Sequence, residues 1–172
     1  MGKKALATRT IGKQNPRHDS ELRFQRILVA VDGSEGSARA SEVAVDLAEK
    51  FNAQLFVLNV FQGYPKYVTM FPSVPAPSGN ALQAYEAYAR KAALEVVART
   101  VSMAEKKDVK AKPQTSETVG SVVQAITDYA ASEKIDLIVM GTRGLGGFKK
   151  MLLGSVSSGV VTHAQCAVLV VR

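Results

Sequence analysis

Short apolar runs alternate with helical periodicity from residue 26 to the end of the chain. Residues 27–31 and 54–60 are short runs dominated by apolar residues, which is typical of strands buried on both faces. Between them, apolar residues recur at steps of three and four from Ala40 to Phe51, which predicts one face of a helix. Strand, helix and strand in this order predict a βαβ unit with parallel strands and a right-handed crossover.

The same alternation continues through the rest of the chain. It predicts a long helix over 81–107, a polar strand over 109–118, a helix over 119–130, a buried strand over 135–140, a short helix that Ser155 opens and a last strand over 167–171. Pro113 places the polar strand at a sheet edge, because proline cannot donate to the ladder. The order of elements predicts an α/β protein with a parallel sheet covered by helices on both faces.

Two segments fall outside this pattern. Residues 1–24 are polar, basic and without periodicity, so we expect a disordered arm before a folded domain over 25–172. Residues 61–80 contain four of the six prolines and predict an irregular excursion, which could be a lid, a partner contact or simply a mobile loop.

Composition and charge narrow the classes of function. The 172 residues are 47% hydrophobic and 22% charged, and no apolar run approaches the roughly 18–20 residues of a membrane helix. Residues 1–26 carry +5 of the net charge of +7. Most of the excess positive charge therefore belongs to the arm, and weak binding of a polyanion by the arm is an alternative. Nucleic-acid binding by the domain is not expected.

Single titratable residues predict little chemistry of their own. Cys166 is the only cysteine and is expected to be a small core residue, with redox sensing as the alternative. His163 is expected to play a structural role near a helix end, and the two histidines lie too far apart to suggest a metal centre. Tyr85 and Tyr88 are expected to pack. No secretory signal is apparent at the start, so we expect a cytoplasmic protein.

A cluster of glycines follows the strand predicted over 135–140. Residues 141–147 contain four glycines, and Gly154-Ser155 come seven residues later. Glycines let a phosphate approach backbone N–H groups, Ser155 fits a helix N-cap, and helix starts favour anions. Arg143 adds positive charge nearby. The cluster predicts a phosphate site, with a flexible loop before a capped helix as the alternative.

Three positions follow predicted strands at the edge where open α/β sheets bind ligands. Asp32, Val60 and Gly141 stand at the carboxyl ends of the first, second and fourth strands. Asp32 is a candidate ligand-binding residue, with the role of a turn former as the alternative. Neither the P-loop pattern nor the dinucleotide fingerprint occurs in the chain.

The spacing Gly141-x2-Gly144-x9-Gly154-Ser155 resembles the nucleotide-binding signature of the universal stress protein family. Residues 27–34, 135–144 and 167–171 agree with that family, and the resemblance covers residues 25–172. It implies a single Rossmann-like domain, similar to adenine nucleotide alpha hydrolases, with the sheet order 3-2-1-4-5. It also implies a homodimer through the edge strand Val168–Val171 and binding of ATP, with AMP or ADP as alternatives and Mg²⁺ accompanying ATP.

The resemblance also implies roles for individual residues. Asp32 would lie near the ribose and phosphates or a metal ion, and Val60 would contact the adenine through its backbone. Met140 and Gly141 would line the sugar and base. The residues that the resemblance places at the phosphates are Gly144, Gly154, Ser155 and Val156. The positive charge of Arg143 adds it to the candidate nucleotide-binding residues. Ala30 departs from some ATP-binding members, which have proline at that position of the pocket wall.

The function that the resemblance implies is an ATP-binding regulatory or stress-response protein. We expect a binding protein rather than an enzyme, because Asp32 is the only acid in a suitable place near the glycine cluster. One alternative is a slow ATPase or self-phosphorylating enzyme, with Asp32 holding Mg²⁺ and Ser155 or a nearby hydroxyl accepting phosphate. The other is a nucleotide-free dimeric scaffold, in which residues 61–80 or the basic arm bind partners.

Overall fold

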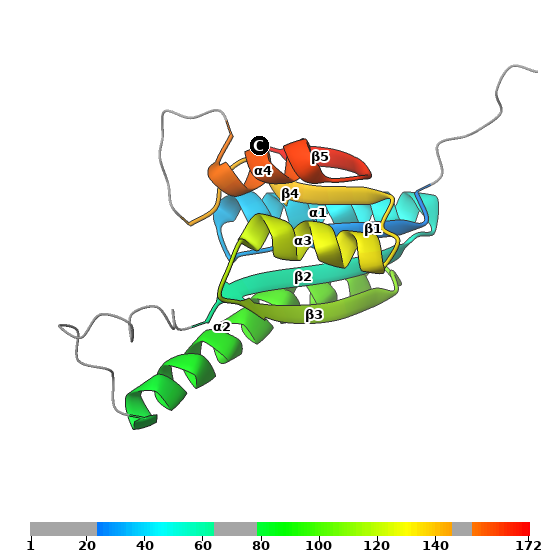
Figure 1. The fold of residues 1–172 in the computed structure, drawn as a ribbon. Helices are drawn as coiled ribbons and strands as arrows, with labels where there is room; N and C mark the ends of the chain where they lie inside the picture. The colour runs from blue at the N-terminus through cyan, green and yellow to red at the C-terminus, as the bar shows by residue number, and fades with distance from the viewer. Residues whose placement is uncertain (1–23, 64–78, 146–152) are drawn as a thin grey trace, which may run out of the picture.

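A computed structural model describes residues 24–63, 79–145 and 153–172 as a parallel five-stranded sheet with four helices (Figure 1). The strand order is β3-β2-β1-β4-β5, which confirms the predicted fold class and topology. The elements are β1 (Arg26–Ala30), α1 (Glu35–Phe51), β2 (Gln54–Gln62), α2 (Gly79–Glu105), β3 (Ala111–Thr118), α3 (Val122–Ser132), β4 (Leu137–Gly141), α4 (Ser155–His163) and β5 (Ala167–Val171).

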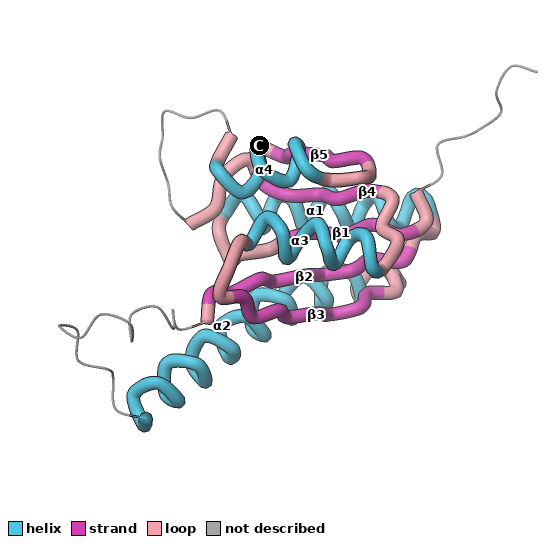
Figure 2. Tube along the Cα trace, viewed as in Figure 1, coloured by secondary structure: helices cyan, strands magenta, loops and turns pink. Residues whose placement is uncertain are grey.

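Two helices cover each face of the sheet (Figure 2). Alternate residues of a strand point to opposite faces, so Ile27 and Val29 of β1 join α1 and α2 in a first core cluster. Leu28, between them, joins α3 and α4 in a second core cluster on the other face. The apolar runs seen in the sequence are continuous because these strands are buried on both sides.

The weak strand and the last strand occupy the two edges. Pro113 lies in β3, in register with Val57 of β2, at the edge where the sequence predicted it. β5 pairs with β4 alone among the described strands. In the described part of the chain, no helix is both long and apolar enough to cross a membrane.

The largest difference from the predicted packing lies in α2. Its first half extends beyond the sheet (Figures 1 and 2), and its buried residues begin only at Ala93. Tyr88 is 73% exposed, so the prediction that its ring packs was wrong, whereas the exposed fraction of Tyr85 is 44%. Helical periodicity indicates which residues share a face, but it does not indicate where the sheet beneath the helix ends.

Smaller differences concern element boundaries. Helix α3 begins at Val122 rather than at Val119, because the Ser121 hydroxyl accepts a hydrogen bond from the backbone N–H of Gln124 and caps the helix. Val119 lies before this cap and is exposed. The predictions for residues 1–23 and 64–78 lie outside the described residues.

Candidate functional site

A cavity of about 390 Å³ opens at the carboxyl ends of β1, β2 and β4, between α3 and the start of α4. This is the edge where open α/β sheets bind ligands. All of the sequence-predicted site residues line it: Asp32, Val60, Met140, Gly141, Arg143, Gly144, Gly154, Ser155 and Val156. The fold therefore brings together residues that lie up to 124 positions apart in the chain.

One side of the cavity is apolar. Its wall combines strand residues with one side of α3 and one residue of α4. The side chains are those of Ala30, Leu58, Val60, Val122, Ile126, Met140 and Val156. Sequence reasoning placed Val122 and Ile126 on a helix face but did not connect that face with the site. An apolar slot of this kind suits a flat aromatic group.

The other side of the cavity is formed by Asp32 and by the glycine segment, residues 141–145, which are the described part of the glycine cluster. The carboxylate of Asp32 accepts hydrogen bonds from the backbone N–H of Ser34, at 3.0 Å, and of Leu145, at 3.1 Å. The first is the local turn contact expected of an aspartate at this position. The second joins the β1–α1 turn to the glycine segment, 113 residues further along the chain.

The glycines of this segment and Gly154, at the start of α4, differ in what surrounds them. A Cβ on Gly144 would lie 2.4 Å from Oδ2 of Asp32, so only glycine lets the carboxylate approach this backbone. A Cβ on Gly141 would lie 2.7 Å from the carbonyl carbon of Gly36, at the start of α1. Gly141 thus lines the cavity and also allows α1 to approach the end of β4. A Cβ on Gly154 would make only ordinary contacts, 3.4 Å or more away.

The start of α4 faces the cavity, and no side chain within the described ranges caps it. We predicted Ser155 as the N-cap, and this was wrong: Gly154 is the N-cap, with extended backbone angles, and Ser155 is the first helical residue. Gly154 has no side chain that could satisfy the N–H groups of the first turn. These backbone donors stand at the cavity rim with Ser155 and Val156, where an anion can accept from them.

Ser157 and Thr142 fix the position of this helix start. The carbonyl oxygen of Thr142 accepts from the backbone N–H of Gly154, at 2.7 Å, and from the hydroxyl of Ser157, at 2.8 Å. The backbone N–H of Thr142 donates to the carbonyl of Val171 in β5, at 2.9 Å. Ser157 is buried and lines the cavity. Sequence reasoning missed it, and the only signal was a second serine two positions after Ser155.

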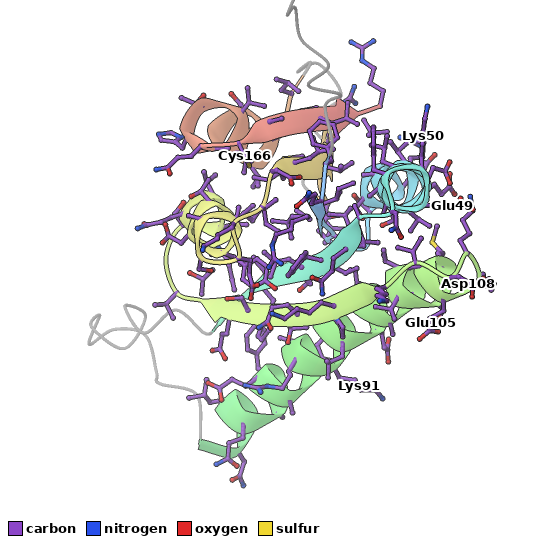
Figure 3. All side chains as sticks on the ribbon, turned by 90° about the vertical axis from the view of Figure 1, so that its right-hand side faces the viewer. Glu49, Lys50, Lys91, Glu105, Asp108 and Cys166 are labelled. Carbon is purple, nitrogen blue, oxygen red and sulfur yellow. The ribbon has the colours of Figure 1, made fainter. Side chains whose placement is uncertain are left out.

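The remaining titratable candidates lie elsewhere or are structural. His163 places Nδ1 2.8 Å from the carbonyl oxygen of Gly159 in the last turns of α4. Cys166 packs against the second core cluster, at the end of the sheet seen in Figure 3. Burial, followed by the nearby charge of Asp136, raises the pKa of the Cys166 thiol, which is therefore protonated at neutral pH. Among the described residues, no group of three or more His, Cys, Asp or Glu side chains could hold a metal ion.

Comparison with known proteins agrees with this architecture. The family model described as "Universal stress protein family" matches residues 23–172. The chain belongs to the universal stress protein family. A universal stress protein of Methanocaldococcus jannaschii is 31% identical to it over 154 residues, which are 90% of this chain and 85% of that protein. The solved universal stress protein UspA from Lactobacillus plantarum is 29% identical, with a TM-score of 0.65, and the match covers 87% of this chain and 99% of that one.

Two more distant members of the family with the same fold were solved with a nucleotide. A universal stress protein in complex with cAMP shares 24% identity and a TM-score of 0.59, and the match covers 87% of this chain and 98% of that one. A family protein from Arabidopsis thaliana with AMP bound shares 17% identity and a TM-score of 0.57, over 86% of this chain and 90% of that one.

Proposed function

We propose that this universal stress protein binds an adenine nucleotide in the cavity at the carboxyl ends of its strands and acts as a nucleotide-dependent regulatory protein in a stress response. The observation that carries the proposal is that one cavity joins an apolar slot to an uncapped helix start. A nucleotide has the same division into a flat base and an anionic tail. The cAMP and AMP complexes of family members with this fold support this choice of ligand.

The base and sugar would occupy the apolar side of the cavity. The adenine would lie between the strand ends and α3, and the backbone of Val60 would hydrogen-bond its edge. Met140 and Gly141 would line the sugar and base, since they end β4 beside this slot. Burial of the flat faces of an aromatic base against apolar side chains supplies most of the affinity in such pockets.

The phosphates would lie at the start of α4. The backbone N–H groups near Ser155 and Val156 would donate to phosphate oxygens, and the helix dipole favours negative charge there by about 0.3–1 kcal/mol. Gly154 presents no side chain at this helix start, and the missing side chain of Gly144 leaves room for the Asp32 carboxylate beside the phosphates. Arg143 lines the same rim and would supply positive charge.

We propose ATP as the resident nucleotide, with AMP or ADP as smaller ligands of the same site. Mg²⁺ would accompany ATP and neutralise phosphate charge. Asp32 is the one carboxylate among the described residues that line the cavity, and its oxygens keep lone pairs beyond the two hydrogen bonds they accept. One carboxylate together with phosphates and water is an ordinary environment for Mg²⁺ in nucleotide sites. A single carboxylate at the cavity fits binding of the nucleotide rather than its hydrolysis.

We further propose a homodimer through β5. This strand lies at a sheet edge, and its Leu169 is 37% exposed. Pairing of residues Val168–Val171 with a second copy would satisfy the backbone groups of the edge and cover this side chain. We also propose that the protein, with its folded domain over residues 25–172, acts in the cytoplasm.

Calorimetric titration of the nucleotide-stripped protein with Mg-ATP and with AMP tests the proposal. We expect saturable binding that Gly154→Val weakens by at least about tenfold, because its branched side chain would enter the space next to the phosphates. Gly79→Val is the matched control, since a Cβ on Gly79 at the start of α2 meets no atom of the described residues within 4 Å. Absence of binding to the folded wild-type protein would overturn the proposed function.

A further inference from the structure

One buried polar side chain stands directly behind the candidate site. Asn59 lies in β2 between Leu58 and Val60, which both line the cavity. Neighbouring residues of a strand point to opposite faces, so Asn59 points away from the cavity, to the side of the sheet that α1 and α2 cover. It is 5% exposed. A buried amide in an apolar strand is costly unless it makes hydrogen bonds.

The Asn59 amide holds the chain just before Asp32. Its Nδ2 donates to the carbonyl oxygen of Val31 at 2.7 Å, and the backbone N–H of Val31 donates to the carbonyl of Leu58 at 2.9 Å. Both bonds lie beyond Ala30, where β1 ends. They extend the connection between β1 and β2 into the turn. The Oδ1 of Asn59 has no hydrogen-bond partner within the described residues, so the amide contacts the rest of the protein through its Nδ2 donor.

The bonds continue from this turn to the glycine segment. Val31 is followed by Asp32, whose carboxylate accepts from the backbone N–H groups of Ser34 and Leu145. Gly144 lets the carboxylate come this close. A continuous path therefore runs from the Asn59 amide through Val31 and Asp32 to Leu145, and every link in it is a hydrogen bond or a covalent bond.

We propose that Asn59 is a positioning residue for the nucleotide site: it sets the place of the Asp32 carboxylate and, through it, of the glycine segment. Only the expected effect on nucleotide affinity rests on the proposed function. Without the Nδ2 donor, the buried carbonyl of Val31 loses a partner and the turn relaxes. The Asp32 carboxylate then no longer meets the Leu145 N–H at the same geometry, although Asn59 itself does not touch the cavity.

The test compares Asn59→Leu with Thr100→Val. Leucine has the same branched shape, with two methyl groups in place of the amide oxygen and nitrogen, and removes the donor. Thr100 is buried on the same side of the sheet and contacts the Ser41 hydroxyl at 2.9 Å, so Thr100→Val removes a buried hydrogen bond outside this path. Urea unfolding measures the loss of stability of both variants. We expect AMP affinity to fall by about five- to tenfold in Asn59→Leu, the scale of one hydrogen bond, and to change by less than about twofold in Thr100→Val.

A second readout follows the path itself in the ligand-free protein. The NMR shift of the Leu145 amide proton reports its hydrogen bond to Asp32, and Asp32→Ala gives the shift when that bond is absent. We expect Asn59→Leu to move the signal in the same direction as Asp32→Ala, and Thr100→Val to leave it in place. An unmoved signal, or wild-type AMP affinity in Asn59→Leu, overturns this inference. A wild-type protein that does not bind nucleotide overturns the proposed function instead, and the amide signal still tests the path.

Discussion

The two ends of the sheet use polar groups in opposite ways. At the amino ends of the strands, Arg26 and Lys112 both pair with Glu133, at 3.0 and 2.7 Å, and both cations lie over the ring of Phe56. The carboxylate of Asp136 accepts from the backbone N–H groups of Gln25 and Arg26. At the carboxyl ends, the first turn of α4 faces a cavity and has no side-chain cap from any residue that the structure describes.

This difference separates the scaffold from the site. Charged groups that find partners within the protein hold elements together and leave little for a ligand to bind. Backbone N–H groups at a cavity rim that have no side-chain acceptor can donate hydrogen bonds to a ligand instead. Both ends are built from the same strands. Changes at the carboxyl end should therefore alter ligand affinity, and changes at the amino end should alter stability alone.

The largest effect is expected from Gly144→Ala. Its Cβ would lie 2.4 Å from Oδ2 of Asp32, so the carboxylate must move and its hydrogen bond to Leu145 is lost. A bond to a charged group contributes about 1.5–3 kcal/mol, so nucleotide affinity should fall by about tenfold or more in calorimetry.

Gly120→Ala is the control for this change, because a Cβ there would lie 3.8 Å from its nearest neighbour, the Thr118 hydroxyl. Unchanged affinity in Gly144→Ala would mean that the contact between Asp32 and the glycine segment does not shape the site. The comparison between the two ends of the sheet would then lose its main support.

Ser157→Ala should have an intermediate effect. The hydroxyl of Ser157 donates to the carbonyl of Thr142 at 2.8 Å, but the backbone N–H of Gly154 also donates to this carbonyl. Loss of one of two bonds should cost about 1 kcal/mol and lower nucleotide affinity by about three- to fivefold.

Thr162→Ala is the matched control for Ser157→Ala, because Thr162 lies in the same helix and its hydroxyl donates to the carbonyl of Ser158 away from the cavity. If both variants weaken binding equally, the effect belongs to the stability of α4 and not to the place of its first turn.

The sequence predicts the scaffold more completely than the contacts of the site. Apolar runs such as residues 27–31 show where strands are buried on both faces, and Pro113 shows which strand lies at an edge. These are local signals. The Asp32–Leu145 bond joins residues 113 positions apart, and no local pattern indicates it. The N-cap of α4 is Gly154 and not the predicted Ser155, and this depends on backbone angles that either residue type can adopt.

The smallest effect on the site is expected at the amino end. Glu133→Gln removes the charge that Arg26 and Lys112 share, so we expect lower thermal stability and unchanged nucleotide affinity. A change in affinity of more than about twofold would show that the two ends are coupled and would break the comparison.

The pH dependence of the stability lost in Glu133→Gln gives a sharper test of the same prediction. The hydrogen bond from Lys112, followed by the charges of Lys112 and Arg26, lowers the pKa of Glu133 from its ordinary value of 4.5. A carboxylate with a lowered folded-state pKa stabilises the protein above the unfolded-state pKa, and this stabilisation disappears as the pH falls through the folded-state value. The gap between the Tm of wild type and of Glu133→Gln should therefore be full near pH 7, begin to narrow near pH 4.5 and close in more acidic solution. A gap that widens with acid would mean that Glu133 contributes to folding through its neutral form.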